Sequence, residues 1–436
     1  MCTQTAGAYH KLRTPAATKP TGCPVDHAFT TFTPNYLSNP YPELERLNAE
    51  QPVFYSEKLG LLVVTRMGDV VEIFREHDVF SSANVQDPIY PVCERATEIL
   101  SAEDFNPIAV ISNRQEPDHK RIRKFTREGF SGRRMKMLEP YIRRRSQELI
   151  DAMLEQGSSA EFVSSFGHPL PGQIIFRFIG FPESDDERLI SWTSNRLAFT
   201  WGQPSEGEQV DIAENMLRYW RYCREFVASR RLERADDLTS ELLDAHDTNP
   251  DELTYAEVES IIYGLSFAGH EIVSNYLSNM LLALLPRRDD WQAICDDPAL
   301  IPNALEEVLR FDSPQTSWRR VTNHDTEFAG VKIPAGTQIF LSLGAANHEA
   351  DEFESPADFD IRRKNARKHI SFGHGIHFCL GARLARLEAQ IALEALSARI
   401  PSLQLAGSQE LEYSPNITFR GPRRLNVRWD SSTTKR

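Results

Sequence analysis

The most informative stretch of the chain reads Phe372-Gly373-His374-Gly375-Ile376-His377-Phe378-Cys379-Leu380-Gly381, a turn marked by glycines that holds one cysteine. An amphipathic helical pattern follows at once, with apolar residues at 380, 384, 387 and 391. The first N–H groups of such a helix would point at the Cys379 sulfur and favour the thiolate over the thiol. Gly373 and Gly375 permit backbone angles that a β-carbon disfavours. The stretch therefore predicts a rigid loop that presents a thiolate.

A thiolate in such a loop can be the axial ligand of a haem iron, where its electron density favours cleavage of an O–O bond. The alternative is a small buried cysteine, which is the usual state of an isolated thiol. The neighbouring residues favour haem. Phe372 would shield the sulfur from water, His377 can reach a haem propionate, and Gly381 lets the helix approach a large flat group. Cys379 is thus a candidate metal ligand and haem b a candidate cofactor, and the buried cysteine remains the alternative at this point.

Composition excludes several other classes of protein. The chain has 436 residues, with 41% apolar and 25% charged residues, as in ordinary soluble proteins. A net charge of −13 argues against a general nucleic-acid binder, which needs a basic surface. The six cysteines show no zinc or disulfide spacing, which fits a reducing compartment. The first residues contain no long apolar run, so we expect neither a signal peptide nor a membrane anchor, and a cytoplasmic protein.

The pattern of segments predicts a mainly α-helical fold with small β-sheets. Residues 1–30 are expected to form a mobile tail, and residues 31–436 a single domain. Residues 53–65 are expected to form a hairpin, residues 80–117 lack clear periodicity, and residues 140–310 are mostly helical by pattern. The longest apolar helical run extends from residue 254 to 285. Further strand-like segments lie at 318–341 and 403–430.

The longest apolar run contains an acid in the sequence Phe267-Ala268-Gly269-His270-Glu271-Ile272. A carboxylate in an apolar helix is costly unless it has a function, so Glu271 is a candidate active-site residue. The alternative is an acid that turns to solvent or finds a basic partner. Residues 120–145 are strongly basic and could steer an acidic partner, or simply form a charged helix surface. His119 and Arg123 lie four residues apart, on one face of a helix.

In their order and spacing, these motifs resemble a soluble bacterial-type cytochrome P450 from about residue 30 to the end. Phe-x-x-Gly-x-His-x-Cys-x-Gly is similar to the haem-binding signature of that family. Trp-Arg-Arg-Val at 318–321 and Thr-Phe-Arg-Gly-Pro at 418–422 resemble most the P450 portion of self-sufficient enzymes fused to a reductase. The resemblance implies a triangular helix-rich domain, with haem between the oxygen-groove helix and the helix after the cysteine. The sequence stops near Trp429, where a fused reductase would begin, so electrons are expected from separate proteins.

The resemblance also implies roles for individual residues. The haem propionates would be held by His119, Arg123, Arg320 and His377, with His369 as a further candidate. The oxygen-binding groove would consist of Ala268, Gly269, Glu271 and Ile272. A buried structural network would join Glu307, Arg310 and Arg363. The substrate pocket would draw on the loop over residues 84–111, including Tyr90 and Phe105, and on Leu265, Phe267, Ala268, Ser317, Trp318 and Ile417. The basic run would surround the thiolate-side face, where a ferredoxin or a flavin/iron–sulfur reductase docks.

The activity implied is a monooxygenase that uses O2 and two electrons from NAD(P)H, through an external reductase, to hydroxylate or O/N-dealkylate a small organic substrate. Ile272 departs from the family pattern, which has Thr after the acid to help deliver protons to bound oxygen. Three other routes remain open: a water organised by Glu271, a hydroxyl group of the substrate, or hydrogen peroxide as the oxidant. A peroxide-driven or atypical oxidation, such as coupling or nitration, is therefore the alternative. A third hypothesis is a haem protein without catalytic activity that binds a ligand or senses a gas. We expect a monomer without membrane or nucleic-acid partners.

Overall fold

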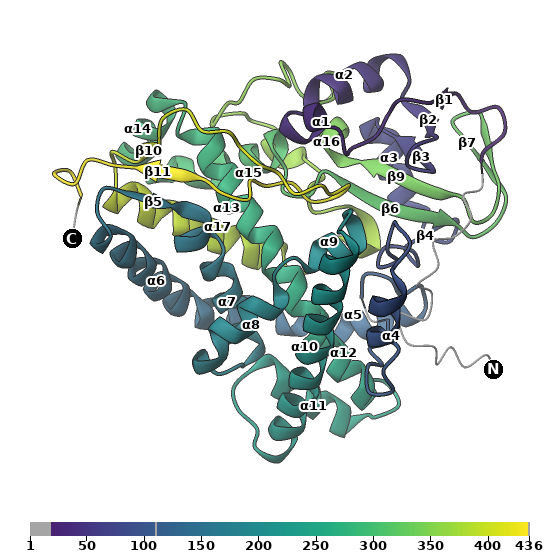
Figure 1. Ribbon diagram of the computed structural model, residues 1–436, viewed down its shortest axis with the longest axis horizontal. Coiled ribbons are helices and arrows are strands. Elements are labelled where there is room, and N and C mark those ends of the chain that lie inside the picture. The colour runs from purple at the N-terminus through teal and green to yellow at the C-terminus, as the bar shows by residue number, and fades with distance from the viewer. Residues whose placement is uncertain (1–18, 110, 435–436) are drawn as a thin grey trace.

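The computed structural model describes residues 19–109 and 111–434, which form a helix-rich body with a β-rich corner (Figure 1). Most of the helices fill two sides of a roughly triangular outline (Figure 1). The strands within residues 25–81 and 317–342 gather at the remaining corner, whereas the short strands at 159–161, 404–405 and 426–428 lie on the opposite side (Figure 1). The prediction of a mainly α fold with small sheets is confirmed. Within the described ranges, no helix combines the length and the apolar character needed to cross a bilayer.

The helices are α1 (Pro34–Ser38), α2 (Tyr41–Glu50), α3 (Met67–Arg75), α4 (Glu94–Leu100), α5 (Asp118–Gly129), α6 (Gly132–Glu155), α7 (Pro169–Ile179), α8 (Asp186–Thr193), α9 (Arg196–Trp201), α10 (Glu206–Leu232), α11 (Leu238–Thr248), α12 (Tyr255–Gly269), α13 (Glu271–Leu284), α14 (Arg288–Asp296), α15 (Ile301–Phe311), α16 (Leu343–Ala346) and α17 (Ala382–Arg399). The strands are β1 (Val25–Asp26), β2 (Val53–Ser56), β3 (Leu61–Val64), β4 (Phe80–Ser81), β5 (Ser159–Glu161), β6 (Ser317–Thr322), β7 (Thr326–Phe328), β8 (Val331–Ile333), β9 (Gln338–Ser342), β10 (Gln404–Leu405) and β11 (Asn426–Arg428).

The largest sheet has six strands in the order β1-β2-β3-β9-β6-β4. Strands β2 and β3 form the predicted antiparallel hairpin, and Gly60 adopts the left-handed φ of 66° that its turn requires. Strand β9 pairs parallel to β3 and antiparallel to β6. Because β6 is held between β9 and β4, its residues Trp318 and Arg320 have fixed positions beside the interior of the helical body.

The predicted mobile N-terminal segment is folded over part of its described residues, 19–30. Residues 1–18 lie outside the described residues, but Val25 and Asp26 form β1 and pair in parallel with β2. Phe29 is buried and packs edge-on against Phe54, with ring centroids 5.3 Å apart. Apolar burial and ladder hydrogen bonds thus bring this segment into the sheet, and the folded region begins before residue 31.

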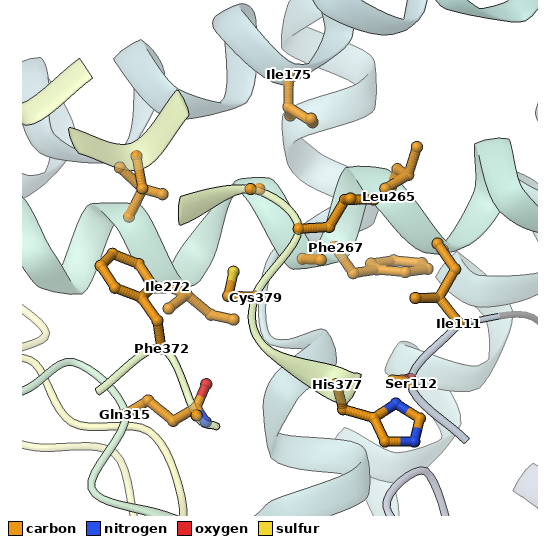
Figure 2. A pocket seen from close by; sticks show the side chains of 18 of the residues that line it. Ile111, Ser112, Ile175, Leu265, Phe267, Ile272, Gln315, Phe372, His377 and Cys379 are labelled. Carbon is orange, nitrogen blue, oxygen red and sulfur yellow. The ribbon is translucent and has the colours of Figure 1, made fainter. Parts of the chain in front are cut away.

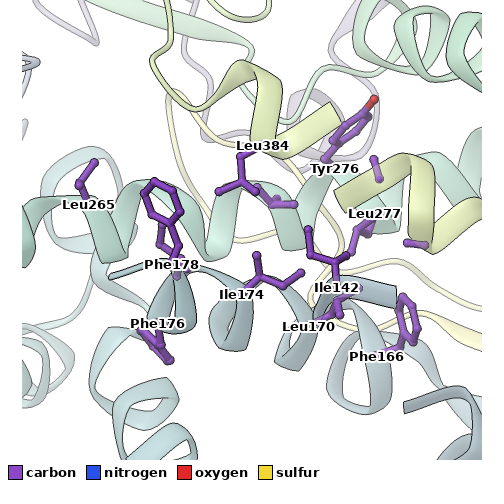
Figure 3. Packing of buried hydrophobic residues seen from close by; sticks show 14 of the residues in the cluster. Ile142, Phe166, Leu170, Ile174, Phe176, Phe178, Leu265, Tyr276, Leu277 and Leu384 are labelled. Atoms are coloured by element: carbon purple, nitrogen blue, oxygen red, sulfur yellow. The ribbon is translucent and has the colours of Figure 1, made fainter. Parts of the chain in front are cut away.

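The main core lies where α6, α7 and α17 pack against the central pair of helices α12 and α13 (Figure 3). Leu170, Ile174 and Phe178 of α7 face Leu265 and Leu277 of the central helices (Figure 3). All five are at most 8% exposed. At about 25 cal/mol per Å² of buried apolar area, such side chains each contribute roughly 1.5–3 kcal/mol. This packing fixes the central helices against which the site is built.

The predicted long helix over residues 254–285 is broken in the middle. Thr254 and Glu257 form a capping box that starts α12, which ends at Gly269. His270 leaves the helical region, with φ −102° and ψ −84°, before α13 begins. Its buried ring is held by Thr193 Oγ1 at 2.9 Å and by the carbonyl of His168 at 3.0 Å. Apolar periodicity alone does not detect this break, because both halves remain buried.

Candidate active site

The cysteine loop is rigid, as expected. The Cys379 N–H donates to the Phe372 carbonyl at 2.9 Å, which closes the turn. Gly373 and Gly375 have φ values of 72° and 71°. A β-carbon at Gly375 would lie 2.8 Å from the Phe74 carbonyl oxygen, so only glycine fits there. The predicted reasons for these glycines are therefore present in the backbone. Gly381, by contrast, has an ordinary φ of −81° and lines a cavity.

The ionisation of Cys379 differs in part from the expectation. The N–H groups of Gly381 and Ala382 hydrogen-bond the sulfur and lower its pKa, as predicted, and the charges of Arg123 and Arg386 act in the same direction. Burial raises the pKa of the thiol more strongly than these groups lower it. The protein alone thus leaves Cys379 a thiol. A bound metal cation would complete the deprotonation, because metals lower thiol pKa values.

A cavity of about 310 Å³ opens above the Cys379 sulfur (Figure 2). Its walls are mostly apolar, as in ligand pockets generally. Among the predicted residues, those that line it are Leu265, Phe267, Ala268, Gly269, Ile272, Trp318, Phe372, Gly373, His377, Gly381 and Arg123. The break between α12 and α13 therefore lies in the cavity wall. A β-carbon at Gly269 would come within 2.7 Å of Ile175, so glycine permits α7 to approach α12 here.

Four predicted pocket residues do not line the cavity, and for these the pocket prediction is wrong. Phe105 packs in the core against Trp220, with ring centroids 6.4 Å apart. Tyr90 packs against Phe32 at 5.6 Å. Ser317 and Ile417 bond to each other, since the Ser317 hydroxyl donates to the Ile417 carbonyl at 2.7 Å. Successive side chains of β6 point to opposite faces of the sheet, which explains why Trp318 faces the cavity and its neighbour Ser317 does not.

Several lining residues were not singled out individually from the sequence, although the loop over 84–111 was expected to contribute. These are Pro107, Ile108, Ile111, Ser112 and Asn113 from one loop, Ile175 from α7, Arg196, Leu197 and Trp201 from α9, and Gln315 and Phe419. The loop is attached to α12, because the Ile108 N–H donates to Ser260 Oγ at 3.0 Å and Arg114 donates to Glu257 at 2.9 Å. The lack of periodicity over 80–117 was the available signal for the loop, since long irregular segments often carry function.

The predicted propionate set gathers at one side of the cavity. The rings of His119 and His377 lie 4.2 Å apart between centroids. His377 Nε2 contacts Ser82 Oγ at 3.1 Å, and His119 Nδ1 contacts Glu116 at 3.3 Å. Arg320 is only 1% exposed, and its guanidinium donates one bond to a neighbouring backbone carbonyl. Burial lowers the pKa of Arg320 to about 9.

Several donors of this set have no partner among the described residues. They are His119 Nε2, His377 Nδ1, and Nε and Nη2 of Arg320. Buried polar groups without partners are rare, because each costs about 1–3 kcal/mol. Burial and the surrounding positive charges also lower the pKa values of His119 and His377. Two carboxylates of a haem would accept from the Arg320 guanidinium, and their negative charge would favour the protonated imidazoles, in which both nitrogens donate. With Cys379 facing the iron, the residues present therefore fit haem b.

The predicted acid of the oxygen groove lies elsewhere. Glu271 is not among the residues that line the cavity; its carboxylate accepts the N–H groups of Asn195 at 2.6 Å and Leu197 at 3.1 Å. It thereby ties the start of α9 to the start of α13. Burial raises the pKa of Glu271 to about 7, although these N–H groups and Arg196 oppose the change. Ile272 does line the cavity and presents no hydrogen-bond donor there.

The predicted structural network is in contact. Arg310 donates two bonds of 2.8 Å to Glu307, and Arg363 donates a third at 3.0 Å. Glu307 and Arg310 are both fully buried. His369, the further propionate candidate, instead contacts Glu306 at 3.0 Å beside Arg386. This second ion cluster satisfies the imidazole, so assigning His369 to a propionate is wrong.

The basic run over 120–145 is less positive than its composition suggests. Five of its arginines pair with acids: Arg121 with Glu257, Arg134 with Glu241, Arg143 with Glu394, Arg144 with Glu183, and Arg145 with Glu148. In the described part of the chain, no ion pair is recorded for Lys120, Arg127, Arg133 or Lys136, all of which are exposed. Phe378, next to the cysteine, is 42% exposed, and its carbonyl accepts a bond from Arg123. Among the described residues of this run, the exposed positive charge without an acidic partner is thus limited to these four side chains.

A buried acid that sequence reasoning missed also borders the cavity. Glu388 of α17 is 1% exposed, and its Oε2 has no hydrogen-bond partner among the described residues. Burial holds its pKa well above the usual range, so the carboxyl is neutral. It lies about two turns into α17, which begins directly after the cysteine loop. The alternation of apolar and charged residues in this helix gave no sign that this one acid points inward.

Comparison with known proteins agrees with this site. The family model described as Cytochrome P450 matches residues 297–397. The chain is 34% identical over 403 residues to the cytochrome P450 monooxygenase PikC of Streptomyces venezuelae, covering 91% of this chain and 92% of that protein. The solved structure of cytochrome P450 CREJ in complex with (4-ethylphenyl) dihydrogen phosphate is similar, with TM-score 0.88 and 37% identity over 93% of this chain and 100% of that chain. An intact type IV self-sufficient cytochrome P450 monooxygenase gives TM-score 0.92 and 36% identity, over 96% of this chain and 55% of that one.

The chain has the features of a haem-thiolate protein. These are a helix-rich fold, a thiol held in a rigid loop, and buried side-chain nitrogens without a partner at one side of a cavity. The chain belongs to the cytochrome P450 family. It is a monooxygenase-type oxidoreductase, and its cofactor is haem b, reduced with electrons from NAD(P)H through a reductase.

Proposed function

We propose that this protein inserts one oxygen atom from O2 into a small, largely apolar organic molecule, by hydroxylation or by O/N-dealkylation. The observation that carries the proposal is the apolar cavity of about 310 Å³ bordered by the Cys379 sulfur. A substrate bound among Leu265, Phe267 and Trp318 would hold its C–H bonds over the face of the cofactor. Haem with a thiolate ligand supplies the activation of oxygen.

The residues of the chain contribute binding, orientation and exclusion of water. Phe267, Trp201, Trp318 and Phe419 give the cavity aromatic walls, which favour an aromatic or compact hydrophobic substrate. CREJ, solved with a 4-ethylphenyl compound, supports an aromatic body for the substrate. Ile272 has no hydroxyl, so protons for oxygen activation must come from water or from the substrate.

The electron donor in this proposal is a separate redox protein, a ferredoxin or a flavin/iron–sulfur reductase. It would dock around Phe378 and the exposed cations Arg127, Arg133 and Lys136, because an acidic partner complements such a patch. Phe378 directly precedes Cys379 in the chain, so a donor bound here would lie close to the sulfur. Relatives of the self-sufficient type carry their reductase in the same chain, which supports the reductase class.

The first test uses purified haem protein. Its ferrous carbonyl spectrum should have the red-shifted Soret band of a thiolate complex; a spectrum typical of a histidine ligand would refute the proposal. The Soret band is then titrated with small aromatics, terpenoids and hydroxylated metabolites. A class that shifts the iron from low to high spin is supplied with NADH, a surrogate ferredoxin and its reductase. A product with one added oxygen atom, labelled from ¹⁸O2, is the expected result.

A second candidate function is oxidation driven by hydrogen peroxide. It is favoured by Ile272 in the cavity wall and by Glu271 turned toward backbone N–H groups, since both features weaken proton delivery to O2. Hydrogen peroxide already carries the electrons and protons that O2 would otherwise have to receive. The same substrate is compared with peroxide and with NADH plus redox proteins. Tight coupling of NADH to product, with little peroxide-driven product, would exclude this candidate.

A further inference from the structure

One neutral amide faces the cavity without using its hydrogen-bonding groups. Gln315 lies two residues before β6 and lines the cavity, and its carboxamide points toward the side where Ile272 and Cys379 lie (Figure 2). Its backbone is fixed, because its N–H donates to Ser313 Oγ at 3.2 Å and its carbonyl accepts from the same hydroxyl at 2.8 Å. Within residues 19–109 and 111–434, the side-chain amide has no hydrogen-bond partner. The segment thus presents an amide that is open to a ligand.

Gln315 adjoins an aromatic corner of the cavity, formed by Trp201, Trp318 and Phe419. The ring of Trp201 has its centroid 6.0 Å from that of Trp318 and 5.0 Å from that of Phe419. The backbone of Gln315 pairs with that of Phe419 in an antiparallel bridge, and side chains directly opposite in such a pair lie on the same face. The amide therefore lies beside an aromatic surface on which a flat apolar molecule could pack.

The indole of Trp201 adds a second unused donor at this corner. Trp201 lines the cavity and is 5% exposed, and its Nε1 has no partner among the described residues. Buried donors without a partner are rare in folded proteins, so this one points to a ligand. The indole can only donate, whereas the amide of Gln315 both donates and accepts. The aromatic corner thus offers donors and an acceptor in surroundings that are otherwise apolar.

A hydroxyl group is the best complement to these groups. Its oxygen can accept from two donors, and its proton can be donated to the Gln315 carbonyl oxygen. An ether or a ketone would leave that oxygen without a donor, and a hydrocarbon would leave every group unpaired. A site that hydrogen-bonds a substrate hydroxyl rejects the analogue without it more strongly than an apolar pocket rejects an extra methylene, because buried polar groups are left unpaired.

We infer that Gln315 is a specificity-determining residue that, together with Trp201, selects substrates with a neutral hydroxyl, a phenol or an alcohol, on an aromatic or compact apolar body. The inference rests on the proposed function and names its substrate class. The hydroxyl would be anchored at Gln315 while the apolar body packs against Trp318 and Phe419. This anchoring would fix which carbon of the substrate faces the cofactor.

The test compares three matched probes with the purified haem protein. 4-Alkylphenols are compared with 4-alkylanisoles, which accept but do not donate, and with 4-alkyltoluenes, in which a methyl group replaces the hydroxyl. Affinities are measured by displacement of 4-phenylimidazole from the iron, which also detects probes that bind without a change of spin state. Direct binding of 4-phenylimidazole checks that each variant keeps an intact, accessible site.

The proteins are wild type, Gln315→Met, Trp201→Phe and a control, Gln292→Met. Methionine has about the length of glutamine but has no strong donor or acceptor, and phenylalanine keeps an aromatic ring without the N–H. The control repeats the glutamine substitution at an exposed position of α14, outside the cavity.

In wild type and in Gln292→Met we expect the phenol to bind about tenfold more tightly than the toluene, with the anisole between them. Gln315→Met should remove the advantage of the phenol over the anisole and leave the affinity for the toluene within about twofold. Trp201→Phe should weaken binding of the phenol and the anisole together, because both lose the indole donor; an unchanged affinity would remove Trp201 from the assignment. Equal affinities in wild type, a preference for the phenol that survives Gln315→Met, or an equal loss for all three probes in that variant would overturn the inference.

Failure of this inference is distinct from failure of the proposed function. If the carbonyl spectrum lacks the thiolate band, the proposed function fails. If that band is present and the toluenes bind and are oxidised as well as the phenols, only the role of Gln315 fails.

Discussion

Replacing Glu271 by glutamine should change how the stability of the protein depends on pH. The Glu271 carboxyl has a pKa of about 7 in the fold, against an ordinary value of 4.5, because burial disfavours its ionised form. Between these two values the native state holds one proton more than the unfolded chain. The free energy of unfolding therefore falls as pH rises through this window. The stabilisation is complete below pH 4.5 and is lost as pH passes 7.

The size of the effect follows from the gap between the two pKa values. A gap of about 2.5 corresponds to at most about 3 kcal/mol, at about 1.4 kcal/mol for each pH unit. Glutamine keeps an oxygen that can accept a hydrogen bond from the N–H of Asn195, but it has no group that titrates in this pH range. The wild type should thus lose about 3 kcal/mol more than Glu271→Gln between pH 4.5 and pH 8.

Urea unfolding at a series of pH values, followed by tryptophan fluorescence, measures this difference. Glu45→Gln, at an exposed position of α2, serves as the control and should follow the wild type. Parallel pH profiles for wild type and Glu271→Gln would refute the reasoning, because they would show that Glu271 titrates alike in the folded and unfolded states.

Four further predictions concern the haem site and its support. Cys379→His should keep some haem but lose the thiolate spectrum and oxygen-driven turnover; oxygen insertion that survived would disprove the axial assignment. Arg320→Gln should release haem to apomyoglobin faster, because donors with no other partner are lost, and an unchanged rate would argue against the propionate contact. Glu307→Gln leaves Arg310 and Arg363 buried without their carboxylate, so we expect a loss of about 3–5 kcal/mol in urea unfolding; an unaltered midpoint would mean that backbone carbonyls suffice. Ile272→Thr should raise the product formed per NADH, whereas unchanged coupling would favour protons from water or substrate.

The sequence predicted well those features that depend on local geometry. Gly373 and Gly375 could be read as left-handed turn positions, because the backbone conformation of a short loop depends on few residues. The hairpin of β2 and β3 was likewise visible from residue type and alternation. The contact between Glu307, Arg310 and Arg363 was implied only by resemblance to a family, since Arg363 lies far along the chain.

Features that depend on long-range packing were not predictable in this way. Tyr90 and Phe105 are aromatic residues in the irregular segment that does supply the cavity wall, yet both pack elsewhere, and Ile111 and Ser112 line it instead. Glu271 lies in the expected helix, but the break at His270 and the backbone N–H groups of the α8–α9 connection determine where its carboxylate points. Arg196 lines the cavity but carries no local signal of this position, because a single arginine in a helical pattern is most often a surface residue.

The attachment of the 107–114 loop has a consequence for protein engineering. Arg114 joins Glu257, and Ile108 joins Ser260, across about 150 positions of sequence, so the loop and the start of α12 form one unit in space. A chimera that takes this loop from a relative without the matching α12 residues would leave Glu257 with fewer donors and the loop without its anchor. Exchanges meant to alter substrate range should therefore move both segments together, and libraries that randomise the loop should keep Arg114 fixed.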